Sequence, residues 1–504
     1  MGRKRLPFGI LLFAFALRLI ALNTRPLWYD EAFAVLFAEK GFRAMLAGTL
    51  TPVAGAASDV HPIVYYTALN GWMQIFGQLP FAVRLLSVFL GLLTVATAYA
   101  IGRHLFNGWA ASAGMLVVAL SPFHVYYSQE TRMYAPLALF CSLVILFFLR
   151  ATAKRYTRRE AAMRDWLGLS ISAALAIYMQ NLAAFFLLAF GLSTLPRPKV
   201  FAKVAAAGAV AFALWLPWFL NLPGQFAKLR QAYWVTRPDF VTLLQTALVY
   251  HAGEEAVARG GQPQGLPLLG LALFAAIVLP LMLVWRASPP EGEARAIWLL
   301  ALAFGTPLLL FLASLYQPVY IQRALLPASL MYSIALGWLL AGAAMPALIR
   351  AVLGGLLAVT SIAGLWAHYT FAQFPRPDFP SAVAFLRQNA GPGDAILHSN
   401  KLTFFPMHYY DRELLQSFLA DPSASGSDTL ALPTQDALGL FAVNEIEAAT
   451  RGAERVWFVI FDRAIEEYAP EPHPHLAWLE ANYVARGERH FDDLTVYEFV
   501  RVGS

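Results

Sequence analysis

Long apolar segments recur along this chain and constrain its fold more than any other feature. Hydrophobic residues make up 59% of the 504 positions, whereas charged residues make up only 13%. A helix that crosses the hydrocarbon core of a bilayer needs about 20 mainly apolar residues, so the sequence predicts a mainly α-helical, polytopic membrane protein of about 11 transmembrane helices. The predicted spans are residues 6–23, 81–101, 109–127, 133–150, 166–180, 182–195, 200–220, 266–285, 296–315, 323–344 and 347–367.

Basic residues indicate how these spans are oriented. With the N-terminus in the cytoplasm, the cytoplasmic loops, including the 154–164 connector, carry more Lys and Arg residues than the longer outer loops between the spans, as the positive-inside rule expects. The C-terminus then lies outside, and without a luminal targeting or retention signal we expect a bacterial cytoplasmic membrane. The net charge of +6 is spread between apolar segments rather than gathered in one patch. This distribution favours membrane lipids as partners and argues against nucleic acid.

The composition changes near residue 370, which predicts two domains. Residues 1–370 are expected to form a transmembrane domain, with two long outer loops at 24–80 and 221–265. The first loop is expected to hold surface helices at 31–47 and 63–77. In the second, the glycine-rich stretch 260–265 is typical of a mobile loop, which acts either as a lid over a site or as a linker.

Residues 371–504 mix polar and apolar positions as a soluble domain does. Short apolar runs there predict strands, and segments with helical spacing predict helices. Because the two kinds alternate, we expect a small extracytoplasmic α/β domain. The predicted strands are 394–398, 455–461 and 494–500, and the predicted helices are 379–389, 434–450 and 475–486.

Polar side chains, most of them ionisable, gather at the predicted outer ends of the helices. Charges at the edge of a membrane are costly unless they are paired or functional. Under the predicted topology all of them lie on one side of the membrane, so we expect a single site at its outer surface. They are Asp30 and Glu31 after the first span, Asp59 and His61 in the first outer loop, Gln129, Glu130 and Arg132 in the turn before span 133–150, and Arg323 at the start of span 323–344.

Short motifs along residues 6–370 carry a family resemblance. They are Arg18, Trp28-Tyr29-Asp30-Glu31-Ala32, His61-Pro62 with Tyr65-Tyr66, Arg84-Leu85-Leu86-Ser87, Ser121-Pro122, Ser128-Gln129-Glu130-Thr131-Arg132-Met133-Tyr134, and Arg323 with Pro327. Together they resemble the GT-C glycosyltransferases, in the branch of the protein O-mannosyltransferases and the bacterial aminoarabinose transferases of lipid A. The resemblance implies a GT-C fold, a polyprenyl-phosphate-linked sugar as donor, and a protein, lipid or glycan as acceptor.

The implied reaction assigns a role to each candidate residue. An acceptor hydroxyl must lose a proton as it attacks the anomeric carbon, and we assign Asp30 as the base. Arg132, Arg323 and His61 are expected to stabilise the leaving lipid phosphate. One base without a covalent nucleophile predicts inversion at the anomeric carbon. The remaining candidates are Glu31 and Glu130 as further catalytic carboxylates, and Asp59, Gln129, Tyr29 and Tyr65 as substrate-binding residues.

Several alternatives stay open at this point. Glu31 either transfers protons or only orients Asp30, and Glu130 either contacts substrate or braces Arg132. Asp30, Asp59 and Glu130 are suitable ligands for a divalent cation, although the resembled branch generally works without one, so we expect no obligatory cofactor. Cys141 is the only cysteine, which excludes an intrachain disulfide. The alternative functions are a transporter or flippase of a lipid-linked sugar and a non-catalytic assembly subunit.

Overall fold

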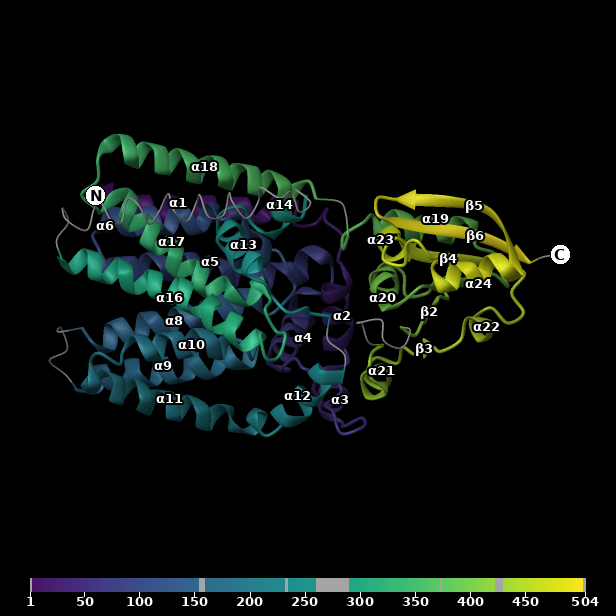
Figure 1. Ribbon diagram of the computed structural model, residues 1–504, viewed down its shortest axis with the longest axis horizontal. Helices are drawn as coiled ribbons and strands as arrows, with labels where there is room; N and C mark the ends of the chain where they lie inside the picture. The colour runs from purple at the N-terminus through teal and green to yellow at the C-terminus, as the bar shows by residue number, and fades with distance from the viewer. Residues whose placement is uncertain are drawn as a thin grey trace. The chain divides into compact units, whose positions relative to one another are not determined.

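The computed structural model describes residues 2–153, 159–231, 234–259, 290–371, 374–421 and 429–501 (Figure 1). The chain divides into two compact units, each assembled from separate stretches. The first, here called the helical unit, comprises residues 1–22, 84–220 and 235–370. The second, the mixed unit, comprises residues 23–83, 221–234 and 371–504. The predicted span 266–285 and the predicted loop 260–265 lie outside the described residues.

Long apolar helices make up the helical unit, and many of them lie side by side (Figure 1). Helix α8 packs on α9, α16 on α17, and α6 on both α1 and α17. The elements are α1 (Gly2–Leu19), α5 (Pro80–Leu105), α6 (Gly108–Leu120), α7 (Pro122–Ser128), α8 (Tyr134–Ala151), α9 (Arg159–Met179), α10 (Ala183–Ser193), α11 (Pro198–Phe219), α13 (Phe240–Ala252), α14 (Glu254–Arg259), α16 (Pro290–Ser314), the 3-10 helix η1 (Gln322–Leu325), α17 (Leu326–Ala341) and α18 (Ala347–Tyr369).

Within the described ranges, six helices are long and apolar enough to cross a membrane, or seven if the bent pair α6 and α7 counts as one span. The six lie in α5, α8, α11, α16, α17 with η1, and α18. The prediction of a mainly helical, multi-pass membrane protein is therefore confirmed. The total of about 11 spans stays a prediction.

The predicted span 109–127 is not one straight helix. It breaks into α6 and α7, which are bent by 61°. Proline has no backbone N–H and cannot continue the hydrogen-bond ladder of a preceding helix, but it suits the first turn of a new one. Pro122 stands in that first turn, and the Ser121 hydroxyl accepts from the His124 N–H at 3.4 Å as the helix cap. The Ser121-Pro122 pair therefore ends one helix and starts the next.

Two glycines set the packing of α6 against α17. A Cβ on Gly337 would lie 2.1 Å from the backbone nitrogen of Gly114, and a Cβ on Gly114 would lie 3.1 Å from the Cα of Ile334. Membrane helices that carry small residues at their contact approach closely enough for extensive van der Waals packing. The closeness of α6 and α17 therefore depends on the missing side chain at Gly337.

A six-stranded sheet organises the mixed unit, with strand order β3-β2-β1-β4-β6-β5. Strands β3, β2, β1 and β4 are parallel, and β6 and β5 continue the sheet in antiparallel fashion. The elements are α2 (Tyr29–Ala38), α3 (Gly41–Leu50), α4 (Val64–Phe76), α12 (Leu222–Gln231), α19 (Phe379–Asn389), β1 (Ala395–His398), α20 (Lys401–Tyr410), β2 (Ser417–Leu419), α21 (Leu432–Leu438), β3 (Ala442–Val443), α22 (Ile446–Ala449), β4 (Arg455–Phe461), α23 (Asp462–Glu466), α24 (Pro474–Asn482), β5 (Tyr483–Phe491) and β6 (Leu494–Arg501).

Alternate residues of β4 serve two cores on opposite faces of the sheet. Trp457 and Val459 pack with residues of α19, whereas Phe458 and Ile460 pack with residues of α24. Side chains of a strand alternate between its faces, so a continuous apolar run is expected where both faces are covered. The predicted strands 394–398, 455–461 and 494–500 and the predicted helix 379–389 match β1, β4, β6 and α19.

Three helix predictions in this unit were too long. Segment 31–47 is two helices, because Gly41 adopts a left-handed conformation with φ of 82° between α2 and α3. Segment 434–450 is likewise interrupted, since Gly439, with φ of 70°, ends α21 and β3 follows. Glycine adopts positive φ without the steric cost of a Cβ and commonly ends helices this way. Segment 475–486 ends as a helix at Asn482, where the edge strand β5 begins.

The glycine contact between α6 and α17 is testable. We expect Gly337→Ala to lower the melting temperature of the detergent-solubilised protein, because overpacking a closely packed contact typically costs about 1–3 kcal/mol. Gly305→Ala on α16 is the matched control, since a Cβ added at Gly305 meets nothing within 4 Å. Alanine is the better helix former, so the control is expected to be neutral or stabilising. An unchanged melting temperature for Gly337→Ala would contradict this packing.

Candidate active site

The Asp30–Glu31 pair lies in the first turn of α2, in the mixed unit. The partial positive charge of a helix N-terminus stabilises carboxylates placed there. Consecutive residues of a helix point about 100° apart, so the two side chains face different surroundings. Asp30 is half-buried, whereas Glu31 has no exposed surface. The pair therefore consists of one carboxylate at the surface of the unit and one in its interior.

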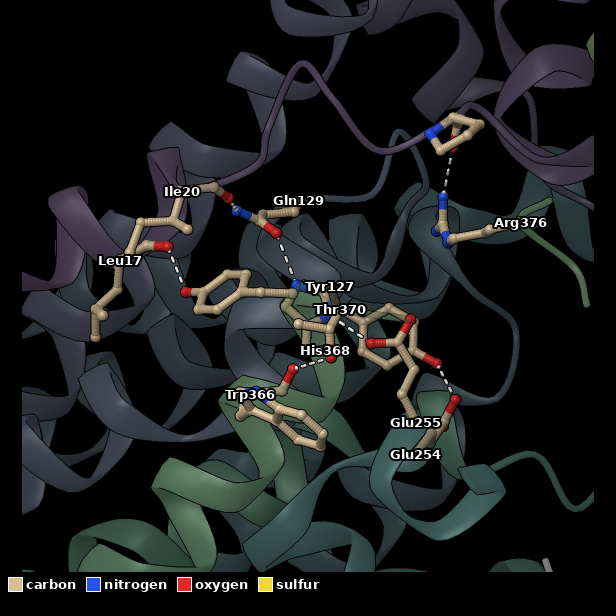
Figure 2. Close-up of polar contacts among 12 residues, drawn as sticks. Leu17, Ile20, Tyr127, Gln129, Glu254, Glu255, Trp366, His368, Thr370 and Arg376 are labelled. Atoms are coloured by element: carbon tan, nitrogen blue, oxygen red, sulfur yellow. Dashed lines mark hydrogen bonds and ion pairs between the residues drawn. The ribbon is translucent and has the colours of Figure 1, made fainter. Parts of the chain in front are cut away.

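Arg376 is the partner of the buried carboxylate. Its Nη1 donates to Glu31 Oε2 at 2.6 Å. The same nitrogen donates to the Pro26 carbonyl at 3.2 Å, the contact of Arg376 that Figure 2 draws. The guanidinium carbon lies 5.5 Å from the centre of the Trp28 ring. Both members of the ion pair are almost fully buried, with 2% and 0% of their side chains exposed. Sequence reasoning missed Arg376, because a single arginine in the linker between Pro375 and Pro377 shows no pattern.

Asp59 and His61 form a compact turn in the same unit. Asp59 Oδ1 accepts from the backbone N–H groups of Val60 at 2.5 Å and of His61 at 3.1 Å, and it lies 2.9 Å from Nδ1 of the His61 ring. Burial raises the pKa of Asp59, but the attraction of His61 and these hydrogen bonds outweigh it and leave the pKa below its usual value. The pair thus holds an ionised carboxylate against an imidazole.

The two predicted substrate-binding tyrosines of this unit have aromatic neighbours. Tyr29 lies with its ring centre 5.6 Å from that of Phe405 and 6.0 Å from that of Phe33. Tyr65 on α4 is 2% exposed and packs edge-on against Tyr66, with 6.0 Å between the ring centres. Helix α4 packs against α2. Both tyrosines therefore pack among aromatic side chains of α2, α4 and α20.

In the helical unit, the side chain of Gln129 is fixed by three hydrogen bonds. Its Nε2 donates to the carbonyls of Arg18 at 2.9 Å and Ile20 at 2.7 Å, and its Oε1 lies 2.7 Å from Nε2 of His368. Figure 2 shows the contacts with Ile20 and His368. Carbonyls only accept, so the amide nitrogen must face them and the amide oxygen must face the ring. Nε2 of His368 therefore carries a hydrogen. These contacts compete with the predicted role of Gln129 in substrate binding, which stays a prediction.

The hydrogen-bond chain continues from His368 to a carboxylate. Nδ1 of the ring lies 2.5 Å from Oε2 of Glu255, and both side chains are buried. Since Nε2 already carries a hydrogen, one further proton lies between Nδ1 and the carboxylate. The chain Glu255–His368–Gln129 thus connects α14, the end of α18 and the turn after α7, and it ends on the carbonyls of Arg18 and Ile20 at the end of α1.

Glu130 and Arg132 lie in the same turn and are 1% and 2% exposed. The Arg132 N–H donates to the Glu130 carbonyl at 2.8 Å, so the turn closes tightly on itself. Arg323, from η1, lies with its guanidinium carbon 5.4 Å from the centre of the Tyr134 ring. A cation over an aromatic face is favourable. The three predicted residues therefore come from two elements of one unit.

Tyr127 and Glu254 add to this cluster. The Tyr127 hydroxyl donates to Glu254 Oε2 at 2.7 Å (Figure 2), and the phenol lies within electrostatic reach of Glu130 and Arg323. Burial raises the pKa of Glu254, although the Tyr127 hydrogen bond and the Arg323 charge act in the opposite direction. Glu254, Glu255 and His368 were all missed from the sequence. Glu254-Glu255 is an adjacent carboxylate pair like Asp30-Glu31, so the same signal was present.

The predicted site residues thus fall into two sets. Asp30, Glu31, Asp59, His61, Tyr29 and Tyr65 belong to the mixed unit, and Gln129, Glu130, Arg132 and Arg323 belong to the helical unit. Their meeting in one site stays a prediction. Across the described ranges, no group of three or more His, Cys, Asp and Glu side chains is arranged to hold a metal ion. The suggested cation ligands Asp30, Asp59 and Glu130 divide between the units, and metal dependence also stays a prediction.

Comparison with known proteins identifies the class of fold. Residues 60–220 match the family model described as dolichyl-phosphate-mannose-protein mannosyltransferase. The fold is that of the GT-C glycosyltransferases of the protein O-mannosyltransferase and aminoarabinose-transferase type, and the resemblance predicted from the sequence is confirmed. No curated protein matches the chain.

Two solved structures show the likeness over the whole chain. The crystal structure of ArnT from Cupriavidus metallidurans in the apo state matches with a TM-score of 0.63 and 13% identity, over 97% of this chain and 97% of that chain. The structure of ArnT from the same organism bound to undecaprenyl phosphate matches with a TM-score of 0.60 and 14% identity, over 99% of this chain and 98% of that chain. Both matches show a likeness of fold.

The Asp59–His61 turn predicts a pH-dependent contribution to stability. Because the pKa of Asp59 is lowered on folding, its ionised form stabilises the fold above the unfolded pKa, and this contribution is lost as the pH falls through the folded pKa. Asp59→Asn keeps an oxygen acceptor for the two backbone N–H groups. We expect it to lower the melting temperature at about pH 6, with a difference that shrinks below about pH 4. A difference that grows on acidification would contradict the assignment.

The orientation of Gln129 predicts the effect of an isosteric change. Gln129→Glu replaces the donor that serves the Arg18 and Ile20 carbonyls, and a buried carbonyl without its donor costs about 1–3 kcal/mol. We expect a clear loss of thermal stability in detergent. Gln74→Glu is the matched control, because Gln74 is exposed and its amide donates to Asn70 one turn earlier on the same helix. Equal melting temperatures for the two variants would argue against the hydrogen-bond chain.

Proposed function

We propose that this protein is an inverting glycosyltransferase that moves a sugar from a polyprenyl-phosphate donor to a hydroxyl acceptor. The observation that carries the proposal is the match of the whole chain to ArnT bound to undecaprenyl phosphate. The match of residues 60–220 to the mannosyltransferase family model supports the same class of reaction. The half-buried carboxylate of Asp30 at a helix N-terminus supplies a base of the kind this reaction needs.

In this mechanism Asp30 accepts the proton of the acceptor hydroxyl. The acceptor oxygen forms a bond to the anomeric carbon while the bond from that carbon to the phosphate oxygen breaks. The electron pair of the broken bond stays with the lipid phosphate, and the proton stays on Asp30 until solvent removes it. A carboxylate within hydrogen-bond reach performs such proton transfer efficiently. Because the attack is direct, the configuration at the anomeric carbon inverts.

The leaving lipid phosphate needs positive charge rather than a proton. Arg132 and Arg323 are the candidates from the helical unit, and His61 is the candidate from the mixed unit. Arginine donates paired N–H groups to phosphate oxygens and keeps its charge at all relevant pH values. Preorganised donors of this kind stabilise the transition state because they need no rearrangement as charge develops.

Glu31 and Glu130 take supporting roles in this proposal. Glu31 is held by Arg376 in the interior of the mixed unit, which favours orientation of Asp30 over direct proton transfer. Glu130 lies in the turn that also carries Arg132, so it is suited to holding that arginine. Tyr29, Tyr65 and Asp59 remain the candidates for sugar or acceptor contacts.

We further propose that the reaction takes place at the outer face of a bacterial cytoplasmic membrane, and that residues 371–504 lie outside the membrane on the same side. The distribution of basic residues supports this orientation. A polyprenyl phosphate is anchored in the bilayer by its lipid tail, so a site at the membrane surface is where its phosphate is reachable. The acceptor is then a hydroxyl of a protein, lipid or cell-envelope glycan.

Identification of co-purified lipid tests the donor class directly. We expect mass spectrometry of the detergent-purified protein to detect a polyprenyl phosphate, with or without an attached sugar. The transporter alternative predicts movement of lipid-linked sugar across liposomes without product. A charged residue within a predicted span is typical of a transport pathway, but Arg18 is fully buried and donates to the Ala14 and Ala119 carbonyls and the Ser128 hydroxyl. Flipping without transfer would overturn the enzymatic proposal.

Replacement of the proposed base provides the test of mechanism. Asp30→Asn keeps the size of the side chain but removes the proton acceptor, so we expect kcat to fall by about 10²–10⁴-fold. Asp436→Asn is the matched control on an exposed position of α21, and we expect wild-type activity. The measurement is transfer from a polyprenyl-phosphate sugar in nanodiscs, with membrane insertion and melting temperature recorded for both variants. Wild-type kcat in Asp30→Asn would exclude it as the base.

A further inference from the structure

Residues from the C-terminal part of the chain surround the start of α2. Arg376 holds Glu31 and the Pro26 carbonyl, as described above. The Tyr410 hydroxyl accepts from the Leu27 N–H at 2.8 Å. Phe405 lies against the rings of Tyr29 and Phe33, with ring centres 5.6 Å and 5.9 Å apart. All of these contacts lie within the mixed unit.

The contacts occur on both sides of Asp30. Leu27 and Tyr29 precede it, and Glu31 and Phe33 follow it, so the backbone of the first turn is held before and after the proposed base. Helix α20, which carries Phe405 and Tyr410, packs against α2. A helix turn that is fixed at four positions around one residue has little freedom to rotate, and the direction of the Asp30 side chain is set by that rotation.

The ion pair between Glu31 and Arg376 is the strongest of these constraints. Both side chains are almost completely buried, and a buried pair is stable only while both charges are present and well placed. Loss of one partner leaves an uncompensated charge in the interior. Because Glu31 is the residue directly after Asp30, any shift that relieves the lone charge at Glu31 also moves Asp30.

We propose that Arg376 is a positioning residue for catalysis, and that residues 371–504 belong to the catalytic apparatus through it. Arg376 does not touch the reacting atoms. It holds Glu31 so that the carboxylate of Asp30 stays within reach of the acceptor hydroxyl, and Phe405 and Tyr410 on α20 support the same turn. The inference rests on the proposed function, in which Asp30 is the base. Displacement of a catalytic group by about 1 Å costs up to about 10²-fold in rate.

The test compares variants of the pair in the nanodisc transfer assay. We expect Arg376→Gln and Glu31→Gln each to lower kcat by about 10- to 100-fold, with the KM for donor changed less than about twofold. The double variant Glu31→Gln/Arg376→Gln removes both charges, so its loss should be no larger than that of either single variant. Losses that multiply in the double variant, or a change confined to KM, would overturn the proposal.

Arg412 provides a matched control. Its Nη1 donates to Glu39 at 2.8 Å, just beyond the other end of α2, so it joins the C-terminal part of the chain to the same helix. This pair is partly exposed, with 41% and 16% of the side chains accessible, and surface pairs contribute little. We expect Arg412→Gln to keep kcat within about twofold of wild type. A loss as large as that of Arg376→Gln would show a general effect of loosening the helix and would refute the specific role of Arg376.

A second variant keeps the test decisive if Arg376→Gln does not fold. Tyr410→Phe removes only the hydroxyl that accepts from Leu27, and we expect kcat to fall about threefold or more at unchanged KM, with a lowered melting temperature but a folded protein. Wild-type kcat in Tyr410→Phe together with an unfolded Arg376→Gln would overturn the proposal. Failure of the proposed function has a different signature, namely no transfer by the wild type or full transfer by Asp30→Asn. An active wild type, an inactive Asp30→Asn and an unaffected Arg376→Gln would reject this inference alone.

Discussion

The buried ion pair between Glu31 and Arg376 is the interaction on which the proposed chemistry depends. Two carboxylates stand next to each other in the first turn of α2, yet they have different environments. Glu31 is completely buried against a guanidinium, whereas Asp30 remains half-buried. A buried charge is tolerated only with a partner, and Arg376 is that partner for Glu31. The arginine therefore gives two adjacent carboxylates different environments, and we propose that only Asp30 takes part in the chemistry.

The helical unit uses the same principle around the turn that carries Glu130 and Arg132. Gln129 is held by two main-chain carbonyls and by His368, which is itself held by Glu255. Buried polar groups that satisfy one another fix a single geometry, because breaking any one bond leaves a desolvated group behind. In both units, residues distant in sequence hold the candidate catalytic residues. A transferase needs this rigidity, since rate depends on placing charge before the reaction begins.

Helices and strands that depend on a local pattern of apolar residues were predictable from the sequence. Apolar length indicated the membrane helices, and short apolar runs indicated β1, β4 and β6. Edge strand β5 carries Arg486, Glu488 and Arg489 and is mostly exposed. It lacks the apolar run that indicates a buried strand, so its first residues were predicted to continue the preceding helix. Pairings across long separations could not be predicted. Arg376 lies 345 residues from Glu31, and His368 lies 239 from Gln129. Arg376 sits in a proline-rich linker, where no periodicity indicates its burial.

The central claim is that Asp30 acts as a base in a single displacement at the anomeric carbon. The most direct measurement is the anomeric configuration of the product, determined by NMR from a donor of known configuration before any spontaneous anomerisation. We expect a product with the opposite configuration to the donor. A product that retains the donor configuration would require a covalent intermediate or a second displacement, and it would contradict the account.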